Sequence, residues 1–168
     1  MKFFNTYIKS PDTAISLLLS VIMCFVLPTY IKADFALSFY NIGITVLSII
    51  FSLFFAALAI IMSSTDNDFI DFLEDENDKA FTGLMETFKV VLIALFVSLM
   101  YSIVLYTTTD YYIKLHSAEI AKQTKSLFII FQFLFTYSLI ATALSISDTL
   151  KFTSVRTKFL SSRKKNRG

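Results

Sequence analysis

The chain has 168 residues, of which 55% are hydrophobic and only 17% are charged, and its mean hydropathy is +0.67. A soluble domain of this size needs far more polar surface, so the composition excludes an ordinary soluble protein. With three glycines, two prolines and no ten-residue alternation of apolar and polar residues, a membrane β-barrel is also disfavoured. We therefore expect an all-α integral membrane protein, an antiparallel bundle of four transmembrane helices.

The first apolar run covers residues 13–31 and is predicted to be a membrane helix. Residues 10–12 read Ser-Pro-Asp, which is typical of a helix start: serine caps, proline fits the first turn and aspartate favours the positive end. The run also resembles a signal peptide. Cleavage after Ala33 would place the large Ile31 where a small residue is needed, so we expect a retained anchor.

The second apolar run follows a predicted tight turn at 32–35 and covers residues 36–62. At about 1.5 Å per residue it is longer than the ~30 Å hydrocarbon core of a bilayer. We expect this helix to tilt or to project from the membrane.

An acidic connector occupies residues 63–87, and between residues 66 and 86 its net charge is −7, from eight acids and one lysine. Apolar residues lie among the acids, which indicates two amphipathic helical pieces, the second leading into the third membrane helix. The acids that we consider able to dock a cytoplasmic partner are Asp66, Asp68, Asp71, Glu74, Asp75, Glu76 and Asp78.

The second half of the chain is predicted to hold a third membrane helix at 88–107, a polar outer loop at 108–125 and a fourth membrane helix at 126–146. A basic tail follows at 147–168, and we expect its last residues, 161–168, to be disordered. The bases of the tail are Lys151, Arg156, Lys158, Arg163, Lys164, Lys165 and Arg167.

The distribution of positive charge predicts the orientation of the bundle. Four crossings put both termini and the connector on one side, which carries eleven lysines and arginines, against four on the other side. The side richer in lysine and arginine is normally cytoplasmic. We therefore expect a multi-pass protein of the bacterial inner membrane with both termini in the cytoplasm.

Small residues recur four positions apart in each apolar run, a spacing that keeps them on one helix face. They let helices approach closely in a membrane, so we predict that these faces point inward and the phenylalanine-rich faces point to lipid. An alternative is a polar-lined pathway through the bundle or an oligomer. The predicted packing face comprises Ser16, Ser20, Cys24, Ser48, Ser52, Ala56, Ala94, Ser98 and Ser102, with Ser138 and Thr142, or Ala141 and Ser145, in the fourth helix.

Two amides lie at similar depth in the second and fourth apolar runs. Asn41 and Gln132 are predicted to hydrogen-bond to each other, with Tyr101 of the third helix joining them, as a clamp inside the membrane. The alternative is a contact with a ligand or an ion.

The chain offers little for catalysis. No charged residue lies in the middle of an apolar run, which disfavours proton relays and ion-coupled transporters. The single histidine, His116, and the single cysteine, Cys24, fall on different elements, and no spacing of a metal site or phosphate-binding loop is present. We expect no enzymatic activity, no cofactor, no metal site and no direct contact with nucleic acid.

Charge segregation suggests partners for the two cytoplasmic segments. The tail from residue 151 to 167 carries +7 against −7 in the connector. The tail is therefore suited to bind the connector of its own or a neighbouring subunit, or anionic lipid headgroups at about 1 kcal/mol per base. The connector is suited to dock a cytoplasmic protein.

By its size, predicted topology and basic tail, the chain resembles small four-helix inner-membrane proteins of bacteria. Two groups share this plan: immunity proteins against pore-forming bacteriocins, and the membrane subunit of anti-phage defence systems such as Kiwa. The resemblance implies a non-enzymatic membrane sensor or effector in anti-phage defence that acts through oligomerisation and a cytoplasmic partner. The alternatives are a toxin immunity protein and a small homo-oligomeric channel.

Overall fold

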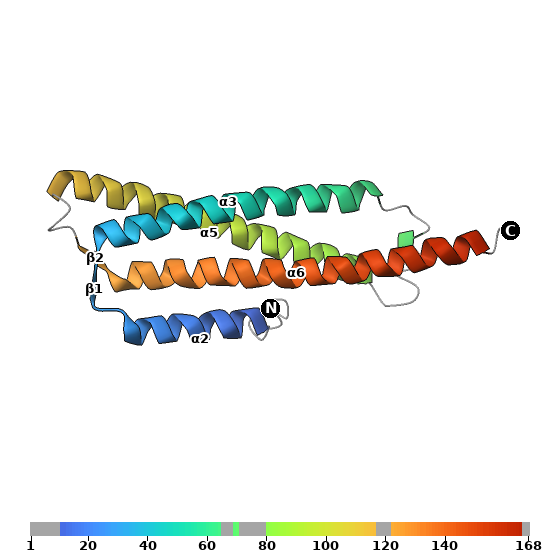
Figure 1. The fold of residues 1–168 in the computed structure, drawn as a ribbon, viewed down its shortest axis with the longest axis horizontal. Helices are drawn as coiled ribbons and strands as arrows, with labels where there is room; N and C mark the ends of the chain where they lie inside the picture. The colour runs from blue at the N-terminus through green and yellow to red at the C-terminus, as the bar shows by residue number, and fades with distance from the viewer. Residues whose placement is uncertain (1–10, 65–68, 71–79, 117–121, 166–168) are drawn as a thin grey trace.

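The computed structural model describes residues 11–64, 69–70, 80–116 and 122–165, and within these ranges the chain is almost entirely helical (Figure 1). This confirms the predicted all-α class for the described residues. Their four long helices are α2 (Pro11–Val26), α3 (Ala33–Ser64), α5 (Ala80–His116) and α6 (Lys125–Lys165).

Three of the four helices are long and apolar enough to cross a membrane. They lie at Ala33–Ser63, Phe81–Leu115 and Lys125–Ser161 and correspond to the second, third and fourth predicted runs. The first helix ends at Val26, before the predicted end at residue 31, because Pro28 has no amide hydrogen to continue it. Its 16 residues extend about 24 Å, less than the ~30 Å core.

The two later helices are longer than predicted. Helix α5 begins at Ala80, so the second amphipathic piece of the connector does lead into the third long helix, and it ends only at His116. Helix α6 continues to Lys165, so residues 161–165 are helical where we expected disorder. The extensions at the helix ends, residues 108–116 and 147–165, contain no glycine or proline, and a Lys114–Asp110 ion pair at 2.7 Å, four residues apart, supports the end of α5. Most of the first connector piece lies outside the described residues.

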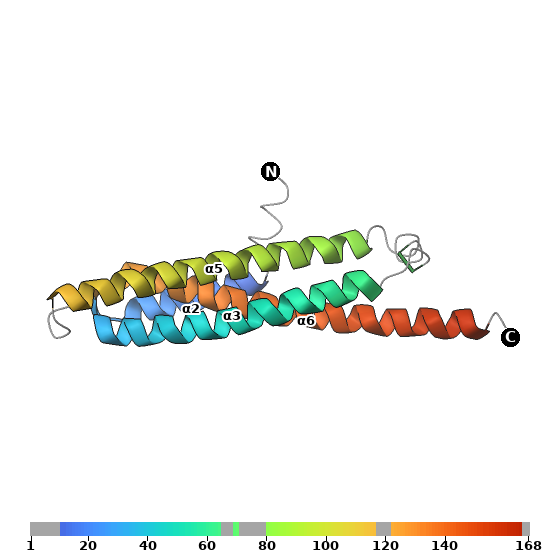
Figure 2. The same cartoon turned by 90° about the horizontal axis from the view of Figure 1, so that it is seen from above.

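The helices run alternately up and down, and α6 lies at the centre of the arrangement. It packs against α2 on one side and against α5 and α3 on the other, while α3 packs along α5 (Figures 1 and 2). The start of α5 and the ends of α3 and α6 lie at one end of the bundle.

A short β-ladder joins the chain at the opposite end. Strand β1 (Tyr30–Lys32) pairs antiparallel with β2 (Lys122–Thr124), and Ile31 lies opposite Gln123. The predicted tight turn at 32–35 is therefore wrong, since Lys32 ends a strand and α3 begins directly at Ala33. The ladder ties the α2–α3 connection to the start of α6.

Two apolar clusters form the core of the described helices. One joins α3, α5 and α6 around Leu47, Phe54, Phe88 and Leu95. The other lies near the β-ladder and contains Ile31, Ala36, Tyr40, Phe128 and Phe131. The expectation that the phenylalanine-rich faces point to lipid does not hold for these rings. Buried aromatic pairs such as Phe54–Phe88, with centroids 4.8 Å apart, fill the space where α3 meets α5.

Candidate functional site

A seam of buried hydroxyl groups joins α5 to α6 in the middle of the bundle. The Oγ atoms of Ser98 and Ser138 lie 2.7 Å apart, and the two residues are 1% and 0% exposed. The Ser98 hydroxyl also lies 3.1 Å from the carbonyl oxygen of Leu134. If Ser98 donates to Leu134, Ser138 can donate to Ser98, so both protons are used. The seam therefore connects two helices directly through side chains of the predicted packing face.

The seam continues through hydroxyls that bond back to their own helices. Ser102 donates to the Ser98 carbonyl and Thr142 to the Ser138 carbonyl, each at 2.7 Å. Small side chains and satisfied hydroxyls let α5 and α6 approach without leaving these polar atoms unpaired. These hydroxyls bond to one another and to main-chain carbonyls. In the single described chain they therefore hold the helices together and do not line a pathway.

On the other helices, some residues of the predicted packing face are buried and others are exposed. In α2, Ser16 and Ser20 are buried, whereas Cys24 is exposed. In α3, Ser52 and Ala56 are exposed, so this part of the prediction is wrong for the single chain. The remaining positions are half-buried Ser48 and Ala94 and buried Ala141, Thr142 and Ser145.

Ser52 and Ala56 are exposed because α3 turns a different face toward the other helices. Ala36, Tyr40, Leu47 and Phe54 are 0–4% exposed and follow one helix face. Gly43 lies on the same face, against the ring of Phe131 in α6. The side chains of this face and one close contact with α6, rather than Ser52 and Ala56, bind α3 to its neighbours.

The predicted clamp of three polar side chains does not form among the described residues. Asn41 is exposed on α3. The Gln132 amide nitrogen donates to Thr136 at 3.0 Å, and its Oε1 atom is buried with no partner in the described part of the chain. The Tyr101 hydroxyl donates to the Leu127 carbonyl at 3.3 Å. Similar depth along the helices was not enough, because each side chain points in a different direction around its helix.

A different polar chain, missed from the sequence, lies beside the β-ladder. The hydroxyl of fully buried Tyr40 donates to Oε1 of Gln123 at 2.8 Å, and Nε2 of Gln123 donates to Oγ1 of Thr109 at 3.3 Å. These two hydrogen bonds link α3, β2 and α5. In the sequence, these contacts are indicated only by a glutamine in the segment predicted as an outer loop.

An aromatic cluster joins the connector to the tail at the other end of the bundle. Phe69 is 1% exposed, and its ring lies 5.3 Å from the rings of both Phe152 and Phe159 in α6. Phe81, at the start of α5, lies 6.3 Å from Phe152. Four aromatic residues from three segments therefore meet where the sequence predicts opposite charges to meet. We call Phe69, Phe81, Phe152 and Phe159 the aromatic junction.

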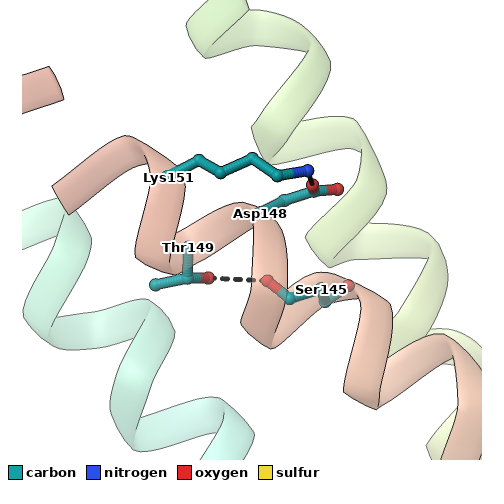
Figure 3. A network of polar contacts seen from close by, with 4 residues as sticks. All are labelled: Ser145, Asp148, Thr149 and Lys151. Carbon is teal, nitrogen blue, oxygen red and sulfur yellow. Dashed lines mark hydrogen bonds and ion pairs between the residues drawn. The ribbon is translucent and has the colours of Figure 1, made fainter. Parts of the chain in front are cut away.

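The charged residues around the aromatic junction are described only in part. All seven predicted docking acids of the connector, and Arg167 of the tail, lie outside the described residues. In α6, Lys151 pairs with Asp148 at 2.8 Å, and Thr149 donates to the Ser145 carbonyl at 2.8 Å (Figure 3). Lys158 is exposed and Arg156 is half-buried. Residues 163–165 extend the same helix, so six of the seven tail bases lie on α6.

The single histidine and the single cysteine lie on different helices of the described residues. Cys24 lies at the end of α2 and His116 ends α5, and no three His, Cys, Asp or Glu residues of the described ranges are placed to share a metal ion. No protein-family model, curated protein or solved structure matches this chain. The aromatic junction is the site that best relates the structure to a function.

Proposed function

We propose that this chain is a non-enzymatic sensor or effector in the bacterial inner membrane, working in anti-phage defence through oligomerisation and a cytoplasmic partner. Three helices with the length and composition of membrane spans support a membrane location. In the proposed orientation both termini and the acidic connector are cytoplasmic, following the excess of lysine and arginine on that side.

The observation that carries this proposal is the position of Phe69. A connector residue is packed between two rings of α6, the helix that lies at the centre of the bundle. A displacement of α6 would act on the connector through this contact, since packed aromatic rings resist separation. The connector, with its acids and its link to α3 and α5, is thus suited to pass a change in the membrane to a soluble protein.

The test is recovery of a cytoplasmic partner with the full-length protein purified from native membranes. Replacing residues 66–78 by a glycine-serine segment of equal length should abolish recovery of that partner. Phe69→Ala should weaken it, because the connector loses its fixed position against α6. Phe25→Ala is the matched control, since Phe25 is 87% exposed on α2, far from the junction in the chain.

A partner that binds equally well after replacement of residues 66–78 would contradict the proposed role of the connector. The same four proteins, each expressed in cells with its genomic neighbours and challenged with phage, test the biological setting. We expect the wild type and Phe25→Ala to reduce plaque formation and the other two variants to lose protection. Equal plaque formation with and without the wild-type chain would overturn the assignment to defence.

A further inference from the structure

The β-ladder brings two lysines together at one end of the bundle. In the antiparallel pairing of β1 with β2, Lys32 lies directly opposite Lys122. Residues directly opposite in such a pair have Cα atoms about 4.5–5.5 Å apart, and like charges at these positions destabilise the pairing. The register of the ladder therefore places two positive charges where a bound anion would offset their repulsion.

Strand β1 turns Lys32 outward. Tyr30 and Lys32 are exposed and Ile31 between them is 4% exposed, as expected for alternate residues of a strand. Gln123, which lies opposite Ile31, accepts the hydrogen bond from the buried Tyr40 hydroxyl at 2.8 Å. The inward side of the ladder is thus used in packing and hydrogen bonding, whereas its outward side presents a lysine to the surroundings.

The chain itself does not neutralise this lysine. Within the described residues Lys32 belongs to no ion pair, although exposed Asp34 lies two residues further along the chain. Other lysines at the same end of the bundle have partners. Lys114 is paired with Asp110 at 2.7 Å, and Nζ of Lys125 donates to a main-chain carbonyl of α2 at 3.3 Å.

The ladder lies where two candidate membrane spans begin. Helix α3 follows β1 directly and α6 follows β2 directly, and the candidate spans start at the same points, Ala33 and Lys125 (Figure 1). Residues just outside the hydrocarbon core lie in the headgroup layer of a bilayer, which is roughly 5–8 Å thick on each side. Tyr30, which is 59% exposed beside this boundary, is a residue typical of that layer.

We propose that the outward side of the ladder binds the phosphate of an anionic phospholipid through the lysines at positions 32 and 122. A phosphate diester carries one negative charge and accepts hydrogen bonds, and each lysine ammonium has three donors, so two lysines can share one phosphate. Residues 30–34 and 122–125 together hold three lysines and one aspartate, a net charge of +2. This excess favours a headgroup without an amine of its own, such as phosphatidylglycerol, over a zwitterionic one.

The inference rests on the membrane location in the proposed function and adds a lipid site at the ladder end of the bundle. The basic tail lies on the far part of α6, which ends at the other end of the bundle (Figure 1). The ladder is therefore a second positive region, in contact with the opposite leaflet.

Thermal unfolding of the full-length protein in the presence of lipid tests the site. The purified protein in dodecyl maltoside is titrated with phosphatidylglycerol, phosphatidylcholine or inorganic phosphate, and unfolding is followed by helical circular dichroism. Phosphatidylglycerol should raise the Tm of the wild type more than either of the others. Lys32→Gln should be at least as stable as the wild type without lipid, because it removes a like charge opposite Lys122. Its apparent affinity for phosphatidylglycerol should be about 5-fold lower, the effect of one base at a membrane surface.

The matched control is Lys114→Gln, which makes the same charge change at the same end of the bundle but in a lysine that pairs within the chain. This variant should keep the wild-type affinity for phosphatidylglycerol. The bases of the tail are present in every variant, so their contribution to lipid binding cancels. Equal affinity of Lys32→Gln and the wild type, equal weakening by Lys114→Gln, or equal stabilisation by phosphatidylcholine or inorganic phosphate would overturn the proposal.

Extraction of native membranes with alkaline carbonate separates this inference from the proposed function. Release of the wild type into solution removes the membrane premise of both. A chain that stays in the membrane, but whose affinity for phosphatidylglycerol does not depend on Lys32, refutes only the lipid site.

Discussion

Gly43 marks the closest approach of α3 to α6, and adding one methyl group there probes this contact. A Cβ atom on Gly43 would lie 2.6 Å from Cζ and 2.8 Å from Cε2 of Phe131. Phe131 has little room to move, because it is 1% exposed, stacks on Phe135 at 5.7 Å and meets the Tyr40 ring edge-on at 4.9 Å. Gly43→Ala must therefore displace a packed ring or separate the two helices.

The size of the effect follows from two opposing terms. Overpacking of a filled core costs about 1–3 kcal/mol. Alanine is better than glycine inside a helix by about 1 kcal/mol, which partly offsets that cost. Gly83 of α5 provides the control, because it is exposed and a Cβ atom there meets nothing within 4 Å. Gly83→Ala should thus be as stable as the wild type or more so, and Gly43→Ala should be about 1–3 kcal/mol less stable than Gly83→Ala.

The measurement is thermal unfolding in detergent, followed by the loss of helical circular dichroism. For a chain of this length, 1 kcal/mol corresponds to a change in Tm of roughly 2–4 °C. We expect the two alanine variants to differ by several degrees, with Gly43→Ala melting first. Equal melting temperatures would refute the close approach of α3 to α6 at Gly43.

Two further predictions concern the polar contacts. In a double-mutant cycle, Ser98→Ala and Ser138→Ala should show a coupling energy of about 0.6–1.7 kcal/mol, since their hydroxyls bond directly; a coupling near zero would contradict the seam. Tyr40→Phe should lower the free energy of unfolding by about 1 kcal/mol, because it removes the 2.8 Å bond to Gln123. Tyr101→Phe, which loses only a 3.3 Å bond to a main-chain carbonyl, is the comparison and should cost less; equal losses would argue against the Tyr40 contact.

The sequence pattern was enough to predict that the described residues are helical and where the long apolar segments lie. Hydropathy summed over some twenty residues is a local property, so the segments at 36–62, 88–107 and 126–146 all fall inside helices of the structure. Helix ends were harder to predict. Hydropathy locates the apolar segment, whereas a helix ends where its main-chain hydrogen bonds stop. Helices α5 and α6 therefore continue beyond residues 107 and 146 into polar sequence that contains no glycine or proline.

The face that each helix turns inward, and the distant residues that meet, depend on how the helices pack together. Helix α3 is apolar on most sides, so its sequence offers two packing faces, and the contacts of Gly43 and Phe54 select one of them. Depth in the membrane suggested a partner for Asn41, but the direction of a side chain around its helix depends on how the whole bundle packs. The contact of Phe69 with α6 likewise joins residues that are some 80 or more positions apart, and no local pattern encodes such a distance.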